Sequence, residues 1–164
     1  METTKDKTTG KQKTVSIKRT FNLPIDIVWK AWSQEESFKK WWGPKNYTCP
    51  SCTIDFKVGG KCLASMKGED GKEIWSTGTY QEIVKNKKIV VTDHFSDSKG
   101  NIIPPPTEMG GEWGDELLIM LDLEEDGDKT NFSLKHKGLP EKMYDECIKS
   151  WNESLDKLEN NLKR

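Results

Sequence analysis

The sequence has 164 residues and a net charge of −1, with hydrophobic and charged residues in nearly equal shares of 33% and 32%. This length fits one domain with a core of its own, and seven tryptophans add apolar area to a modest aliphatic content. We find no apolar run of about eighteen residues and no apolar segment near the N-terminus. The sequence therefore predicts a cytoplasmic protein without a membrane span or a secretory signal.

Charge is distributed unevenly along the chain. Residues 1–73 carry 14 lysines and arginines against 9 acids, whereas residues 74–164 carry 12 against 18. Residues 100–128 contain nine acids and no base. A nucleic-acid groove needs a basic stripe, so we expect no nucleic-acid partner. We interpret the acidic stretch as solvated strand ends and loop, with a docking patch for a basic partner as the alternative.

The first elements follow from periodicity and from proline. Residues 1–13 are polar and aperiodic and are predicted to form a disordered tail, before a single domain over residues 14–164. Alternation predicts a strand over 14–21. Pro24 fits the first turn of a helix that continues to Ser33, and a second short helix is predicted over 35–41.

Six further strands and one long helix complete the pattern. Alternating stretches between turn signals predict strands over 47–58, 61–67, 73–84, 88–95, 115–124 and 130–137. Residues 96–114 hold three consecutive prolines and four glycines, which predicts a loop that is either a lid over a site or a disordered insertion. Apolar residues at every third or fourth position predict a helix over 140–162.

This order of elements indicates an α+β architecture. Short turns join the strands, so we expect them to pair antiparallel, and one face of the sheet must then be covered. Only the last predicted helix, about 35 Å long at ~1.5 Å per residue, is long enough to cover it. The sequence therefore predicts a curved antiparallel sheet wrapped around one long C-terminal helix, with a cavity between them that suits a ligand.

Several motifs resemble one family along nearly the whole chain, residues 14–163. They are FNLP at residues 21–24, WWGP at 41–44, DFKVGG at 55–60, GTYQEI at 78–83 and HKG at 136–138. Together they resemble the C-terminal-type domain of the activator of heat-shock protein 90 ATPase family. The resemblance implies the helix-grip fold of START-like and birch-pollen-allergen-like proteins, the SRPBCC superfamily. It also implies three candidate roles, which are ligand binding, a co-chaperone function in stress response and a polyketide-cyclase-like activity.

Ten residues are predicted to face the cavity because they come from the strands, the long loop and the long helix. They are Arg19, Trp75, Tyr80, Phe95, Met109, Trp113, Met120, His136, Tyr144 and Trp151. Trp75 and Tyr80 differ in parity, so a regular strand cannot turn both inward.

Two other groups of residues have predicted places around this cavity. Arg19 shares the parity of apolar neighbours, and either anchors an acidic ligand group or pairs with an internal acid such as Glu82. Trp29, Trp32, Trp41 and Trp42 are expected to close one end of the fold, and Gly110-Gly111 to hinge the long loop if it is a lid.

The sequence holds little catalytic or metal-binding signal. It lacks a phosphate-binding glycine loop, an HExxH motif and a Ser-His-Asp set that sequence can place. Cys49 and Cys52 form a CxxC, but on a regular strand they point to opposite faces, unless Pro50 introduces a bulge. We therefore expect no metal, no cofactor and a non-enzymatic protein that binds a small apolar or aromatic ligand. A heat-shock chaperone is the alternative partner, and His136 or Arg19 would serve an enzymatic alternative.

Overall fold

A computed structural model describes residues 12–106, 113–114 and 116–162. Its elements, in chain order, are β1 (Gln12–Phe21), α1 (Ile25–Ser33), α2 (Glu35–Phe38), β2 (Cys52–Ile54), β3 (Lys61–Lys67), β4 (Glu73–Val84), β5 (Lys88–Ser96), β6 (Leu117–Asp126), β7 (Lys129–Pro140), the 3₁₀ turn η2 (Glu141–Met143) and α3 (Tyr144–Asn161).

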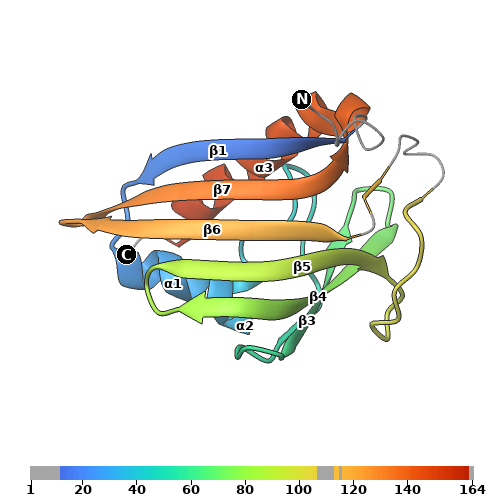
Figure 1. Cartoon of the computed structure of the whole chain (residues 1–164), viewed down its shortest axis with the longest axis horizontal. Coiled ribbons are helices and arrows are strands. Elements are labelled where there is room, and N and C mark those ends of the chain that lie inside the picture. Colours follow the sequence, from blue (N-terminus) through green and yellow to red (C-terminus); the bar gives the residue numbers. More distant parts are fainter. Residues whose placement is uncertain (1–11, 107–112, 115, 163–164) are drawn as a thin grey trace, which may run out of the picture.

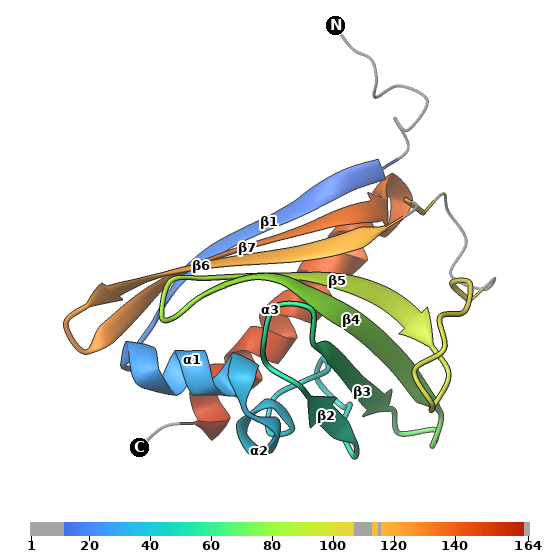
Figure 2. The ribbon, with the colours of Figure 1, turned by 60° about the horizontal axis from the view of Figure 1, so that its bottom comes forward.

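The strands form one seven-stranded sheet in the order β1-β7-β6-β5-β4-β3-β2. All neighbours pair antiparallel, and the first strand returns to pair with the last, with Phe21 opposite Thr130. The sheet is strongly curved, and the three α-helices lie on its concave side (Figures 1 and 2). This architecture confirms the predicted α+β helix-grip fold.

The largest difference from the predicted elements lies in residues 47–58, where β2 is only three residues long. The chain folds back on itself after Asp55, whose carbonyl accepts the backbone N–H of Lys57. Gly59 adopts a positive φ of 86°, and a Cβ on Gly60 would collide with the carbonyl oxygen of Asp55. The predicted glycine turn is therefore a compact loop, and its hydrogen bonds replace most of the predicted strand.

The two ends of the chain also differ from their predicted bounds. Gln12 and Lys13 belong to β1, and the remainder of the predicted tail lies outside the described residues. The predicted helix over 140–162 is divided into η2 and α3, because β7 continues to Pro140. α2 ends at Phe38, before the predicted 41.

Part of the hydrophobic core lies where α1 and the C-terminal half of α3 meet the sheet. We call this cluster the packed region and define it by Phe21, Trp32, Trp41, Phe132, Leu155 and Leu158, all buried. Trp41 is completely buried, and its indole N–H donates to the carbonyl of Ala31 at 2.9 Å. Its ring lies 4.7 Å from that of Trp32. Trp29, Trp32 and Trp41 are thus core residues, as expected.

Candidate functional site

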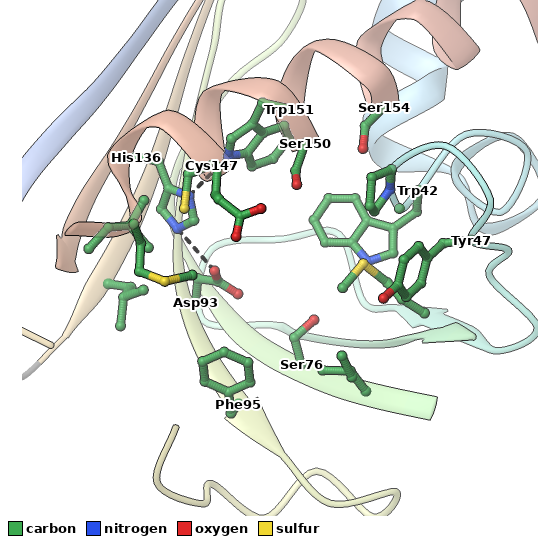
Figure 3. Close-up of a pocket in the computed structure, with 18 of the residues that line it drawn as sticks. Trp42, Tyr47, Ser76, Asp93, Phe95, His136, Cys147, Ser150, Trp151 and Ser154 are labelled. Carbon is green, nitrogen blue, oxygen red and sulfur yellow. Dashed lines mark hydrogen bonds and ion pairs between the residues drawn. The ribbon is translucent and has the colours of Figure 1, made fainter. Parts of the chain in front are cut away.

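A cavity of about 350 Å³ lies between α3 and the concave face of the sheet. Figure 3 shows side chains converging on it from α3, from the strands and from the loop after α2. Apolar and aromatic groups form most of its wall, with a few polar groups among them. We call the residues around it the open region, in contrast to the packed region.

Small side chains on α3 leave the space for this cavity. Cys147, Ser150, Trp151 and Ser154 line it, at the spacing that places residues on one helix face. Ser76 on β4 lines it from the side of the sheet. The side chains of the three serines and of Cys147 are smaller than leucine. They therefore leave unfilled space between the helix and the sheet.

The loop after α2 forms one wall of the cavity through Trp42, Gly43, Pro44 and Tyr47. Gly43 has a positive φ of 101°, which lets the chain reverse at this point. Lys157 on α3 fixes the loop, because its Nζ donates to the carbonyls of Gly43 at 2.8 Å, Pro44 at 3.3 Å and Tyr47 at 2.9 Å. Burial lowers the pKa of Lys157, against the opposing effects of Cys49 and Glu153.

A hydrogen-bonded relay of Trp151, His136 and Asp93 borders the cavity (Figure 3). The indole Nε1 of Trp151 lies 3.1 Å from Nδ1 of His136, and His136 Nε2 lies 3.1 Å from Asp93 Oδ2. Indole nitrogen can only donate, so Nδ1 must accept and the ring hydrogen must reside on Nε2. The relay therefore holds His136 as a neutral imidazole that donates to the Asp93 carboxylate.

The relay also limits what His136 can do chemically. Both of its ring nitrogens are engaged, and its side chain is only 9% exposed, against 23% for Asp93. A general base needs a free nitrogen within reach of the substrate. The polar group that the relay presents to the cavity is thus the carboxylate of Asp93.

A second, much smaller cavity of about 40 Å³ lies beside the first. Trp42, Ser76 and Asp93 line both. The indole N–H groups of Trp32 and Trp42 are buried here without a hydrogen-bond partner among the described residues. The space is large enough for about one or two waters.

Four of the ten predicted site residues lie at the large cavity: Phe95, Trp113, His136 and Trp151. Phe95 and Trp113 meet edge to face, with ring centroids 5.4 Å apart. Met109 lies outside the described residues, so the predicted lid over 96–114 with its Gly110-Gly111 hinge also stays a prediction.

Trp75, Tyr80 and Met120 lie elsewhere. Trp75 alternates with Ile74 and Ser76, which face the cavity, so it lies on the opposite face of β4. Tyr80 is buried at the small cavity, where its ring lies 5.0 Å from that of Phe56. Met120 alternates with buried inner residues of β6 and faces away from the helices.

Arg19 and Tyr144 are also remote from the cavity lining. The guanidinium of Arg19 pairs with Asp156 Oδ1 at 3.0 Å and donates to Asn152 Oδ1 at 3.3 Å, both on α3. The suggested partner Glu82 instead lies 3.6 Å from Lys88. Tyr144 packs against the core, with the Lys13 ammonium 4.0 Å from its ring centre. Arg19 therefore pairs with an acid of the protein itself, which was one of the two interpretations, but that acid is Asp156 and not Glu82.

Several lining residues escaped the sequence analysis, and some carried a usable signal. Asp93 shares strand parity with Phe95, and Met66 shares it with Cys62 and Ala64, which marks both as inward-facing. Trp42 was expected to close one end of the fold together with the other three tryptophans, but it lines the cavity. It follows α2 in a loop, where no periodicity indicates direction.

The four cysteines are free thiols. Burial is the main cause that raises the pKa of Cys49, Cys62 and Cys147 to about 11 and that of Cys52 to about 12. Thiols with such values are protonated near neutral pH and make poor nucleophiles and metal ligands. Within the described residues, no cluster of three histidine, cysteine or acidic side chains is arranged to hold a metal ion.

Comparisons with solved structures and with a family model relate this chain to known proteins. Solved structures with the same fold include a protein from Chromobacterium violaceum, with a TM-score of 0.76 and 21% identity over 92% of this chain and 97% of the other. They also include the AHSA1 protein from Silicibacter pomeroyi, with a TM-score of 0.72 and 20% identity over 92% of this chain and 97% of the other. Likeness at these identities establishes the fold alone. The search of curated proteins found no match.

None of the helices in the described part of the chain is both long and apolar enough to cross a membrane.

Residues 22–163 match the family model described as Activator of Hsp90 ATPase homolog 1-like protein. That match spans most of the sequence and nearly all of residues 14–163, over which the motifs resemble this family. The chain therefore belongs to the family of Activator of Hsp90 ATPase homolog 1-like proteins.

Proposed function

We propose that this protein binds a small apolar or aromatic ligand in the cavity of the open region and does not convert it. The observation that carries the proposal is the cavity of about 350 Å³ between α3 and the sheet. Its volume is at the lower end of the ~300–1,000 Å³ that ligand pockets span, and its mainly apolar wall with few polar groups is typical of such pockets.

The state of the reactive groups favours binding over catalysis. His136 has both ring nitrogens in hydrogen bonds, and Cys147, the thiol at the cavity, has a pKa raised to about 11 by burial. Neither is poised as a base or a nucleophile near neutral pH. Arg19, the other residue of the enzymatic alternative, is paired with Asp156 away from the cavity.

The test is a titration with 4-phenylbutanol, a neutral probe with an aromatic body, followed by NMR of the indole N–H groups. We expect saturable shifts at Trp42, Trp113 and Trp151 below about 1 mM, and no shift at Trp41. Ser150→Phe should fill the cavity and abolish the shifts. Lys149→Phe, on the exposed face of the same helix, is the matched control and should retain them. Unmoved signals in the unmodified protein would overturn the proposal.

The family description favours one second candidate, a co-chaperone role in the cytoplasm. It would require a surface contact with a heat-shock ATPase rather than the cavity. Adding a molar excess of this protein to the ATPase should then raise its turnover, and the Ser150→Phe variant should raise it equally. An unchanged turnover would remove this candidate and leave the ligand-binding proposal intact.

A further inference from the structure

We infer that the ligand of this cavity is an organic cation, an apolar or aromatic body that carries a protonated amine or a quaternary ammonium group. The inference rests on the proposed function, because it specifies the chemistry of what the same cavity binds. Three features carry it: the carboxylates in the lining, the neutral state of His136 and the aromatic rings of the wall.

The charged groups of the lining are acidic. Asp93 and Glu146 both line the cavity, and the lining drawn from the described residues includes neither lysine nor arginine. Lys157 is not among the lining residues, and its ammonium is bound by three backbone carbonyls. A carboxylate ligand would therefore lose its hydration and meet two like charges without a cation to pair with.

The histidines do not reverse this balance. Trp151 donates to Nδ1 of His136, so adding a proton to that ring would break a buried hydrogen bond. His94 also lines the cavity, but its Nε2 lies 3.8 Å from Glu116 Oε2, so any positive charge there faces an acid of the protein itself.

The aromatic rings supply a second attraction for a cation. Trp42, Tyr47, Phe95, Trp113 and Trp151 all line the cavity, and Trp42 lies edge to face against Trp151 at 5.8 Å. The negative face of an aromatic ring attracts ammonium groups, and walls of several rings are the usual means of binding them. An ammonium group here would contact ring faces and the Asp93 carboxylate together, whereas its apolar body would occupy the remaining volume.

The experiment compares three probes with one body and different head groups: 4-phenylbutylamine, 4-phenylbutanol and 4-phenylbutyrate. Calorimetric titration at neutral pH should rank the amine tightest and the carboxylate weakest. A ring–cation contact of ~1–2 kcal/mol corresponds to an amine preference of about 5- to 30-fold over the alcohol. Glu146→Gln and Asp93→Asn should each reduce that preference several-fold. Asp145→Asn, which removes the same charge from the neighbouring exposed position on α3, should leave it unchanged.

The outcomes separate this inference from the proposed function. If the carboxylate binds as tightly as the amine, the cation inference is wrong and the cavity remains a ligand site. If the amine is preferred but both acidic variants retain the full preference, the assignment to Asp93 and Glu146 is overturned. If none of the three probes binds, the proposed function fails together with the inference.

Discussion

The two halves of α3 lie against the same sheet and do different things. The C-terminal half buries Leu155 and Leu158 completely in the packed region, whereas the N-terminal half presents Cys147 and Ser150 to a cavity. The helical spacing is the same in both halves, and the difference lies in the side chains, which include the small Cys147 and Ser150 in one half and the larger Leu155 and Leu158 in the other. In this chain the cavity lies where small side chains occupy part of one helix face.

Trp151 lies where the two regions meet. Its ring stacks on Trp32 of the packed region at 6.0 Å, and its indole N–H donates to His136 of the open region. A rigid core residue thereby sets the orientation of a polar group at the cavity. The packed region is thus the support on which the open region is built, and the following predictions test this division.

The largest expected effect is the loss of a packed-region ring. Trp41→Ala removes a fully buried indole and its hydrogen bond to Ala31, and should lower the free energy of unfolding by about 3–5 kcal/mol in urea denaturation. Phe95→Ala, in the half-buried wall of the open region, should cost less than half as much. Equal losses would show that the two regions do not differ in packing.

The second effect is on thiol reactivity. Burial raises the pKa of Cys147 from 9.0 to about 11, which lowers its thiolate fraction near pH 8 about 100-fold. Alkylation by iodoacetamide should be slower by that factor than for a free thiol, and should accelerate about tenfold per pH unit up to pH 11. A bound ligand should protect Cys147, which lines the cavity, and not Cys49, which does not.

A smaller effect should follow from Trp151→Phe, which keeps an aromatic ring and removes the indole donor. His136 Nδ1 is then left buried without its partner, at a cost of about 1–3 kcal/mol in the free energy of unfolding. In the unmodified protein the imidazole ¹⁵N shifts should show a hydrogen on Nε2 and none on Nδ1, and the Nδ1 signal should move when the indole donor is removed. Unchanged signals would refute the tautomer assigned to His136.

The smallest effect should follow from Asp156→Asn. It removes the acid that pairs with Arg19, but the Asp156 side chain is 64% exposed, so water and salt screen the pair. The free energy of unfolding should change by less than about 1 kcal/mol, and 4-phenylbutanol should bind unchanged. Weakened binding would return Arg19 to the list of ligand contacts.

The fold was largely predictable because strand alternation and helix periodicity are strong along this chain. The bounds of β3 and β4 match the predicted 61–67 and 73–84, since clear turn residues flank both. The segment before β3 was mispredicted because its backbone hydrogen bonds run locally to Asp55 and Lys57, and side-chain alternation carries no record of that.

The candidate site was only partly predictable, because a cavity depends on which face of each element turns inward. Strand alternation correctly predicted that His136 faces the cavity. The same alternation would also have predicted Asp93, which lies two positions before Phe95 on β5. Trp75 and Met120 were chosen because they lie on strands, although their neighbours occupy the inward parity. Glu146 is exposed on α3, so only the three-dimensional structure shows that it borders the cavity.

The single ammonium of Lys157 has a consequence for how the cavity comes into being. The carbonyls that it binds belong to residues 43, 44 and 47, more than 100 positions earlier in the chain. During synthesis this loop is made early. Its position in the cavity wall is fixed only after Lys157, near the C-terminal end of α3, has been made and can donate to these carbonyls. The cavity is therefore among the last features that a newly made chain acquires, and a chain that stops short of Lys157 would lack the contacts that hold this wall.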